Sequence, residues 1–410
     1  MKRRVVVTGM AGLSPLGSDW PGVRAGLLAG RSGVRVMPEW DAYEGLDTRL
    51  GAPVPDFAVP PNYPRKKVRS MGRVALLATR ATELALADAG LTGADVVTNG
   101  STGLAYGSTS GSPPAMEIYA ANFYVKRSIK GIAGTDYLQF MSHTCAANLA
   151  QFFGITGRVI PTCSACTAGS QGIGYAYEAI KYGRQTLMLA GGAEELCPTE
   201  AMAFDTLYAT SRLNDAPQTT PRPYDRDRDG LVIGEGAAIL VLEELEHAQR
   251  RGARIHAELV GFATNSDGVH VTRPEEATMR KVMELALGDA GLEPGAIGYV
   301  NGHGTATEHG DIAETRATAT LFGRVPLSSQ KSYLGHTLGA CGALEAWFSI
   351  EMMNAGWFAP TLNLDSVDPR CGELDYLVGP GRELMPDYVM NNNFAFGGVN
   401  TSMIFRRQER

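Results

Sequence analysis

A segment that occurs twice, half a chain apart, constrains the fold of this 410-residue protein more than any other feature. Residues 81–91 read ATELALADAGL and residues 282–292 read VMELALGDAGL. Each copy is a helix pattern ending at a glycine, the residue that most easily closes a helix. The spacing far exceeds the period of solenoid repeats, so the repeat predicts two halves built on one plan.

Strand-like runs flank both copies of this segment. One opens each half, at 5–8 and 257–260, and a turn-rich run with strand character follows each copy, at 95–107 and 297–304. Buried strands are also expected at 185–190, after a helix that ends at Gly183, and at 237–242. This alternation of strands and helices predicts an α/β fold.

The repeat divides the chain into residues 1–250 and 251–410, with the boundary near 249–254. Between the first copy and Cys166 lies a long insertion, residues 108–157, with mixed helical character. Such an insertion could form a lid, a pocket wall or a subunit contact.

Composition excludes several classes of protein. With 44% hydrophobic and 20% charged residues, the chain can bury a large core and is neither disordered nor fibrous. Glu345 and Glu351 interrupt the longest apolar region, 338–359, which argues against a membrane span. Six cysteines without a recognisable targeting segment indicate reduced thiols and a cytoplasmic location.

A local basic cluster contrasts with the net charge of −6, which argues against nucleic-acid binding. The cluster reads RKKVRSMGR over residues 65–73 and includes Lys66 and Arg69. It is either a solvated helix start or a docking site for an acidic partner, because a local patch can steer association with an acidic protein.

Cys166 lies between a short apolar run and a long amphipathic run, so we expect its thiol at the start of a helix. A helix N-terminus presents unpaired N–H groups and a partial positive charge, which stabilise a thiolate and a developing oxyanion. This place suits a nucleophile. The alternative is an inert buried cysteine that acts as a small hydrophobe.

Three more segments carry groups for thiol chemistry. His303 follows an apolar strand among glycines, and Lys331 and His336 lie in a glycine-rich entry to a helix. Residues 394–400 form a flexible loop whose backbone N–H groups could face a ligand. Each alone has a structural alternative, as a satisfied histidine or an ordinary turn, but together they suffice for thiol chemistry at neutral pH.

Two patterns imitate metal sites. Cys163 and Cys166 form a Cys-x-x-Cys pair, but the chain has no second pair to complete a structural zinc site. Residues 225–230, DRDRDG, begin like a calcium loop, yet the required glutamate would fall at position 236, and Glu235 misses it by one. We therefore expect no metal, and a salt-bridged turn at 225–230.

The chain resembles the β-ketoacyl-acyl carrier protein synthases, the condensing enzymes of fatty acid and type II polyketide assembly, along essentially its whole length. The matching motifs are VVVTGM at 5–10, ACTAG at 165–169, AGGAE at 190–194, RPYD at 222–225, HGT at 303–305, KS and GH within 331–336, and FGG at 396–398. The resemblance implies the thiolase fold, two duplicated halves layered as α-β-α-β-α, and a dimer. It also implies an acyl carrier protein as partner and no cofactor of the enzyme's own, because phosphopantetheine arrives on the carrier.

By this resemblance, Cys166 accepts an acyl chain, and malonyl-carrier protein loses carbon dioxide to give a carbanion that attacks the acyl carbonyl. His303 and His336 would stabilise the enolate, and the backbone N–H groups of Cys166 and Phe396 would form the oxyanion hole. The remaining implied roles are electrostatic for Lys331, structural for Glu345, phosphopantetheine binding for Thr305 and Thr307, gating for Phe396, and carrier docking for Lys66 and Arg69.

The sequence departs from the family pattern at Ala395 and Val399, which replace a glycine and a threonine of the gating loop. Fatty acid elongation is the leading interpretation. The alternative is a ketosynthase of a secondary polyketide or aryl polyene pathway, as a homodimer or paired with a chain-length factor. A non-catalytic chain-length factor is disfavoured because the full Cys-His-Lys-His set is present. A thiolase is disfavoured because it would pair the nucleophile with a second catalytic cysteine late in the chain and one histidine, whereas this chain offers Cys-His-His.

Overall fold

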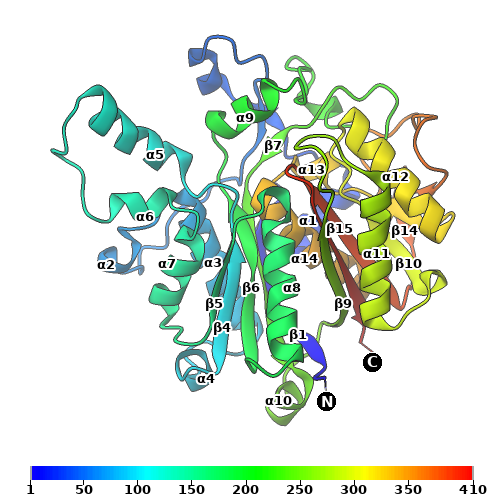
Figure 1. Ribbon diagram of the computed structural model, residues 1–410, viewed down its shortest axis with the longest axis horizontal. Coiled ribbons are helices and arrows are strands. Elements are labelled where there is room, and N and C mark those ends of the chain that lie inside the picture. The colour runs from blue at the N-terminus through cyan, green and yellow to red at the C-terminus, as the bar shows by residue number, and fades with distance from the viewer. Residues whose placement is uncertain (1, 409–410) are drawn as a thin grey trace.

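One continuous mixed sheet organises residues 2–408, the part of the chain that the computed structural model describes (Figure 1). Within those residues it has 11 strands. The first half supplies β1 (Val5–Leu13), β4 (Thr102–Gly107), β5 (Val159–Thr162), β6 (Leu187–Glu194) and β8 (Gly236–Glu244). The second supplies β9 (Ala257–Ser266), β10 (Ile297–Asn301), β11 (Pro326–Ser328), β13 (Asp375–Tyr376), β15 (Tyr388–Ala395) and β16 (Val399–Arg407).

The strand order shows the duplication. Outward from the central β1–β9 pair, the order is β1-β8-β6-β4-β5 on one side and β9-β16-β15-β10-β11 on the other. In each series the first two pairings are antiparallel and the next two are parallel. The two duplicated halves are thus confirmed, whereas the exact division between residues 250 and 251 stays a prediction.

Helices cover both faces of each half. The central pair is α8 (Ala168–Lys181) and α14 (Cys341–Ala355), and the outer helices are α3 (Arg73–Asp88), α7 (Thr144–Phe153), α11 (Glu276–Ala290) and α12 (Glu308–Phe322). Alternate residues of β8 show the layering. Leu240 and Leu242 pack in the core with the central helices, whereas Ile239 and Val241 pack with α3 and α7. A third core joins α11 and α12 to the second half, which confirms the α-β-α-β-α arrangement.

The repeated segment forms the ends of two outer helices, as predicted. α3 stops at Asp88 and Gly90 follows with a φ of 66°, while α11 stops at Ala290 and Gly291 has a φ of 68°. Positive φ is the backbone conformation that favours glycine, so both helices end where the sequence indicated.

The insertion contains α5 (Pro113–Ala120), a π-helical turn at Ala121–Val125, α6 (Asp136–Phe140) and α7. Figure 1 shows α5 and α6 standing away from the sheet. Apolar side chains on this arm are strongly exposed, among them Tyr124 at 74%, Val125 at 81% and Ile129 at 73%. Such a surface on a globular protein marks a contact site.

Shorter elements complete the chain. They are α1 (Trp20–Leu28), α2 (Arg65–Val68), α4 (Asp95–Thr98), α9 (Pro198–Asp205), α10 (Leu245–Arg250), α13 (Lys331–Leu334), and the strands β2 (Arg35–Val36), β3 (Leu50–Ala52), β7 (Ile233–Gly234), β12 (Trp357–Phe358) and β14 (Arg382–Glu383). In the described part of the chain, none of the helices combines the length and the apolar character that spanning a bilayer requires.

Candidate active site

Cys166 lies in a 3₁₀ turn, Ala165–Thr167, that leads directly into α8. The preceding Ala165 has a φ of 49°, an unusual value for a residue with a side chain, so the turn is sharp. The Cys166 side chain is buried, and the backbone N–H groups of Phe396 and of Cys166 itself lie close enough to its sulfur to lower the pKa of the thiol. The sequence therefore placed the thiol correctly at a helix start.

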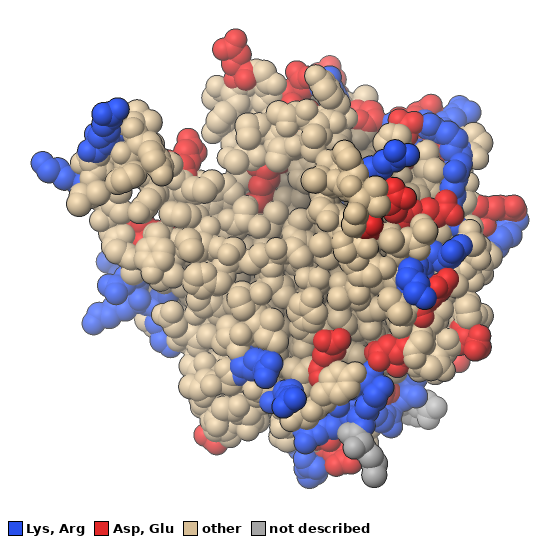
Figure 2. Space-filling view, viewed as in Figure 1, with Lys and Arg blue, Asp and Glu red and all other residues tan. Residues whose placement is uncertain are grey.

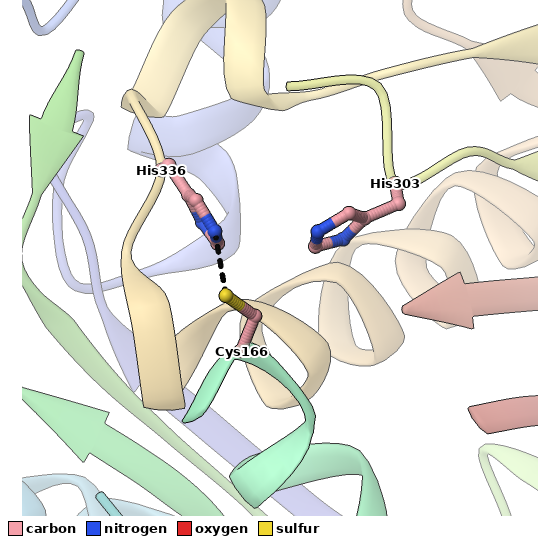
Figure 3. Close-up of side chains that lie close together, drawn as sticks. All are labelled: Cys166, His303 and His336. Carbon is pink, nitrogen blue, oxygen red and sulfur yellow. Dashed lines mark hydrogen bonds between the residues drawn. The ribbon is translucent and has the colours of Figure 1, made fainter. Parts of the chain in front are cut away.

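Two histidines from the second half face this sulfur (Figure 3). His336 Nε2 lies 3.0 Å from Cys166 Sγ, and the rings of His303 and His336 are nearly perpendicular, with centroids 5.2 Å apart. The backbone N–H of Leu338 donates to His336 Nδ1 at 3.3 Å. Because Nδ1 accepts a hydrogen bond, the proton of the neutral ring is on Nε2, which points toward the sulfur.

Lys331 fixes the other ring in the same way. Its Nζ lies 3.1 Å from His303 Nδ1 and also contacts the carboxylate of Glu345. An ammonium group can only donate, so His303 Nδ1 accepts and Nε2 carries the proton. Burial is the largest single effect on the pKa of Lys331 and lowers it, but Glu345, Cys341 and Glu314 together outweigh burial and leave the pKa raised, which keeps the amine charged.

Burial sets the charge of the reactive groups. Desolvation, followed by the nearby Lys331 charge, holds the pKa values of His303 and His336 well below the usual range, so both rings are neutral at pH 7. Burial likewise raises the pKa of Cys166 to about 11, against the opposing effects of Lys331 and the two backbone N–H groups. The N–H groups and Lys331 favour the thiolate in the expected direction, but desolvation of the sulfur outweighs them in the free protein.

A cavity of about 430 Å³ opens onto this centre. Its lining includes Cys166, His303, His336, Thr305, Thr307, Phe204 and Phe396. The hydroxyls of Thr305 and Thr307 lie 2.8 Å apart, and the backbone N–H of Thr305 donates to Asp311 at 3.0 Å. The structure therefore brings both threonines to the same cavity as the thiol.

The segment predicted as a flexible loop at 394–400 is mostly strand. β15 and β16 pair up to Ala395 and Val399, so only Phe396, Gly397 and Gly398 form the turn. Both glycines have positive φ, which a tight hairpin requires. The Phe396 ring packs on Phe204, with centroids 5.3 Å apart.

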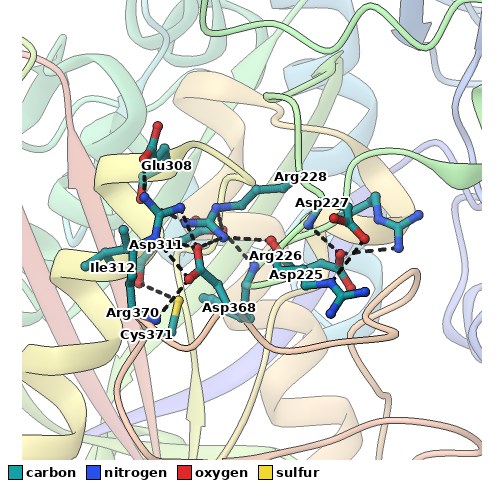
Figure 4. A network of polar contacts seen from close by, with 12 residues as sticks. Asp225, Arg226, Asp227, Arg228, Glu308, Asp311, Ile312, Asp368, Arg370 and Cys371 are labelled. Atoms are coloured by element: carbon teal, nitrogen blue, oxygen red, sulfur yellow. Dashed lines mark hydrogen bonds and ion pairs between the residues drawn. The ribbon is translucent and has the colours of Figure 1, made fainter.

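The 225–230 segment is a salt-bridged turn, as predicted (Figure 4). Asp225 accepts hydrogen bonds from the backbone N–H groups of Asp227, Asp365 and Ser366. The buried Arg228 pairs with Asp368 at 2.8 Å and with Asp311 at 3.5 Å. Asp225 and Asp227 also pair with Arg222 and Arg226, so these carboxylates, which imitate a calcium loop, already have backbone and arginine partners.

Three predicted residues lie outside the centre. Lys66 is exposed on α2, and Arg69 follows it at the end of that helix. Cys163 is exposed, and its thiol donates to the carbonyl of Ser142 at 2.8 Å. It is therefore separate from the cluster around Cys166.

Two buried residues at the site were missed from the sequence. Asn393 donates to Glu345 at 2.7 Å, and the Cys341 thiol donates to the carbonyl oxygen of Cys166 at 3.2 Å. The only signal for the first was three consecutive asparagines, 391–393, inside a strand pattern. Nothing local marks Cys341, because its proximity to Cys166 depends on the packing of α14 against α8.

Sulfur and two imidazoles are also potential metal ligands. The ligand atoms of Cys166, His303 and His336 lie within 4.8 Å of one another. The charged Lys331 beside His303 disfavours a cation there through like-charge repulsion. The arrangement instead suits two neutral N–H donors beside a nucleophilic sulfur.

Family models match both halves of the chain. The family model for the β-ketoacyl synthase N-terminal domain matches residues 2–248, and that for the C-terminal domain matches residues 256–365. The chain is 38% identical over 415 residues to 3-oxoacyl-[acyl-carrier-protein] synthase 2 of Vibrio cholerae, with 99% of each chain covered.

Solved structures with the same fold cover the full length of the chain. A β-ketoacyl synthase from Burkholderia phymatum is 58% identical, with a TM-score of 0.98 and 100% of both chains covered. A type II PKS acyl-carrier protein in complex with its ketosynthase gives 30% identity and a TM-score of 0.90, again with full coverage.

Proposed function

Because this chain belongs to the β-ketoacyl synthase family, we propose that it is a 3-oxoacyl-acyl carrier protein synthase of fatty acid elongation. It condenses an acyl group held on Cys166 with malonyl-acyl carrier protein and releases carbon dioxide. One observation carries the proposal: the Nε2–H groups of His303 and His336 converge on the space beside the Cys166 sulfur.

In the first step, the Cys166 sulfur attacks the thioester carbonyl of an acyl-carrier protein. The backbone N–H groups of Cys166 and Phe396 stabilise the oxyanion, and their effect on the pKa of the thiol places them beside the reacting sulfur. The carrier thiolate leaves and takes the proton that Cys166 gives up. One thioester replaces another, so the acyl-enzyme can await the second substrate.

In the second step, malonyl-carrier protein loses carbon dioxide, and the electron pair of the broken bond moves toward its thioester oxygen. The two Nε2–H groups donate to that oxygen and stabilise the enolate. Its carbon then attacks the carbonyl of acyl-Cys166. A carbon–carbon bond forms, the carbon–sulfur bond to Cys166 breaks, and the sulfur takes a proton from solvent.

The surrounding residues support these steps. Lys331 holds the His303 tautomer, Glu345 holds Lys331, and Thr305 and Thr307 bind the phosphopantetheine arm that arrives on the carrier. Phe396 acts as the gate, and its contact with Phe204 is one position of that gate. Lys66 and Arg69 dock the acidic carrier.

The exposed apolar arm of the insertion supports a homodimer, because a second copy would cover side chains such as Tyr124 and Val125. Sedimentation equilibrium of the purified protein measures this directly, and a monomer at micromolar concentration would contradict it.

The alternative function in a polyketide pathway with a chain-length factor has weaker support, since the polyketide relative is 30% identical against 38% for the fatty acid enzyme.

The test of the proposed function separates the two half-reactions. Cys166→Ala should abolish condensation, whereas His303→Ala and His336→Ala should suppress malonyl decarboxylation by about 100-fold or more and acylation of Cys166 far less. Intact-protein mass after incubation with acyl-carrier protein reports acylation, and released carbon dioxide reports decarboxylation. Full chain elongation by Cys166→Ala, or equal loss of acylation in both histidine variants, would contradict the mechanism.

A further inference from the structure

Three buried asparagine side chains form a chain of amides that ends at His303. Asn301, at the end of β10, donates from Nδ2 to Asn391 Oδ1 at 2.8 Å. Asn391 lies opposite it in β15 and donates to Asn393 Oδ1 at 3.2 Å. Asn393 then donates from Nδ2 to Glu345 Oε2 at 2.7 Å and lies 3.4 Å from His303 Nδ1. All three side chains are fully buried.

The amides of this chain all point the same way, because each NH₂ group donates to the next side chain. The oxygen of Asn393 accepts the amide of Asn391, so its NH₂ group must face Glu345 and His303. Aligned amides in a low-dielectric interior polarise one another, which strengthens the final donor. The β strand sets the geometry, because residues 391 and 393 lie on the same face of β15.

The orientation of the Asn393 amide matters because the carboxyl group of Glu345 lies close to His303. A carboxylate oxygen of Glu345 and a ring nitrogen of His303 lie within 4.8 Å of each other. A free carboxylate at that distance would favour a proton on Nδ1 of His303, and Nε2 would then be an acceptor instead of a donor. The Nδ2 group of Asn393 donates to Glu345 Oε2 and faces His303 Nδ1. Lys331 Nζ donates to the other carboxylate oxygen, Glu345 Oε1.

We propose that Asn393 is a positioning residue that keeps the proton of His303 on Nε2, by holding the Glu345 carboxylate and donating toward Nδ1. The proposal rests on the proposed function, in which that Nε2–H stabilises the enolate formed on decarboxylation. Asn393 itself does not touch the substrate and acts only through His303 and Glu345.

Two substitutions at this position and one control test the role. Asn393→Asp keeps the size of the side chain and replaces the donor by an acceptor, while Asn393→Ser keeps a single, shorter donor. The matched control is Asn392→Ser, because Asn392 is equally buried in the same strand but faces the opposite side, where it contacts Met283 of α11. The control reports what loss of a buried amide does to the fold alone.

Asn393→Asp should lower kcat for malonyl decarboxylation by about 10- to 100-fold, with KM and the rate of Cys166 acylation within about twofold of the wild type. Asn393→Ser should fall between Asn393→Asp and the wild type, and Asn392→Ser should match the wild type. If Asn393→Asp does not fold, loss of decarboxylation in Asn393→Ser with acylation retained supports the proposal. Unchanged decarboxylation in Asn393→Ser would then overturn it.

A second readout is independent of activity. The chain has seven histidines, so ¹⁵N-histidine labelling gives a resolvable spectrum in which the His303 signals are those lost in His303→Ala. We expect the Nε2–H tautomer in the wild type and an Nδ1–H fraction in the Asn393 variants. An unchanged tautomer overturns the proposal, and so does a changed tautomer with unchanged decarboxylation. A wild type that does not decarboxylate malonyl-carrier protein would instead overturn the proposed function, while the tautomer result would stand on its own.

Discussion

At the Cys166 sulfur, desolvation competes with hydrogen bonding and with the charge of Lys331. Desolvation has the larger effect, so Cys166 in the free protein is a neutral thiol with a pKa of about 11. A buried neutral thiol is protected from adventitious oxidation and alkylation, because the thiolate is the reactive form. The same N–H groups that fail to ionise the thiol remain available for the oxyanion of the tetrahedral intermediate.

The raised pKa predicts how the reactivity of the Cys166 thiol depends on pH. Below its pKa the thiolate fraction rises about tenfold per pH unit, so alkylation of Cys166 by iodoacetamide should keep rising from pH 7 to above pH 9. Lys331→Met should slow alkylation at each pH, because the ammonium lowers the pKa of the thiol. Peptide mass mapping in a Cys163→Ser background removes the signal of the exposed thiol. A rate that levels off near pH 7 would contradict the raised pKa.

Among the elements, the duplication extends to the nucleophile turn itself. A 3₁₀ turn with a positive φ precedes each central helix: Ala165–Thr167 before α8, and Leu338–Ala340 before α14, where Leu338 has a φ of 45°. The residue that corresponds to Cys166 is Gly339, whose backbone N–H donates to the carboxylate of Glu194 at 3.1 Å. The second turn thus binds an internal carboxyl group, whose pKa burial raises to about 7, whereas the first turn faces the cavity.

The close packing of α8 on the sheet predicts the effect of a glycine substitution. A Cβ on Gly172 would lie 2.9 Å from the carbonyl oxygens of both Ala105 and Gly191, which belong to strands and cannot move aside. Gly172→Ala should therefore reduce stability by about 1–3 kcal/mol.

Gly288 provides the matched control, because it is a helical glycine in α11 with no atom near its Cβ position. Gly288→Ala should leave stability unchanged or raise it by up to about 1 kcal/mol, through helix propensity alone. Chemical denaturation of the two variants measures both effects. Equal stability of Gly172→Ala and the wild type would contradict the close packing.

At the scale of the whole molecule, an acidic protein carries a local basic surface at α2. Figure 2 shows blue side chains at the edge of the molecule where Figure 1 places α2. Lys67 is anchored there, because its Nζ donates to the carbonyl of Phe152 at 2.6 Å. Lys66 and Arg69 are exposed and make no ion pair within residues 2–408, so their charges are available to an acidic partner.

Charge reversal tests this surface. Lys66→Glu with Arg69→Glu should weaken binding of acyl carrier protein at low salt, and the difference from the wild type should shrink as salt screens the charges. Titration calorimetry at two ionic strengths measures this. Arg324→Glu is the control, since Arg324 is exposed on the loop between α12 and β11 and should leave affinity unchanged. Equal affinity of the α2 variant and the wild type would place the docking site elsewhere.

Local sequence patterns were enough to predict the duplicated α/β fold, the helix ends at Gly90 and Gly291, and the types of side chain at the site. These follow from local patterns, because periodicity, caps and motifs are read within a few residues of one another. The thiol, the two histidines and the lysine could therefore be predicted as a group.

The charge and orientation of these groups depend on how the two halves pack together. The raised pKa of Cys166 comes from burial between the two halves, and the histidine tautomers come from Leu338 and Lys331. The role of Asn393 depends on strands far apart in the sequence that meet in one sheet. Protonation and orientation depend on distances and desolvation, which arise only when both halves pack together, so no local pattern in the sequence could give them.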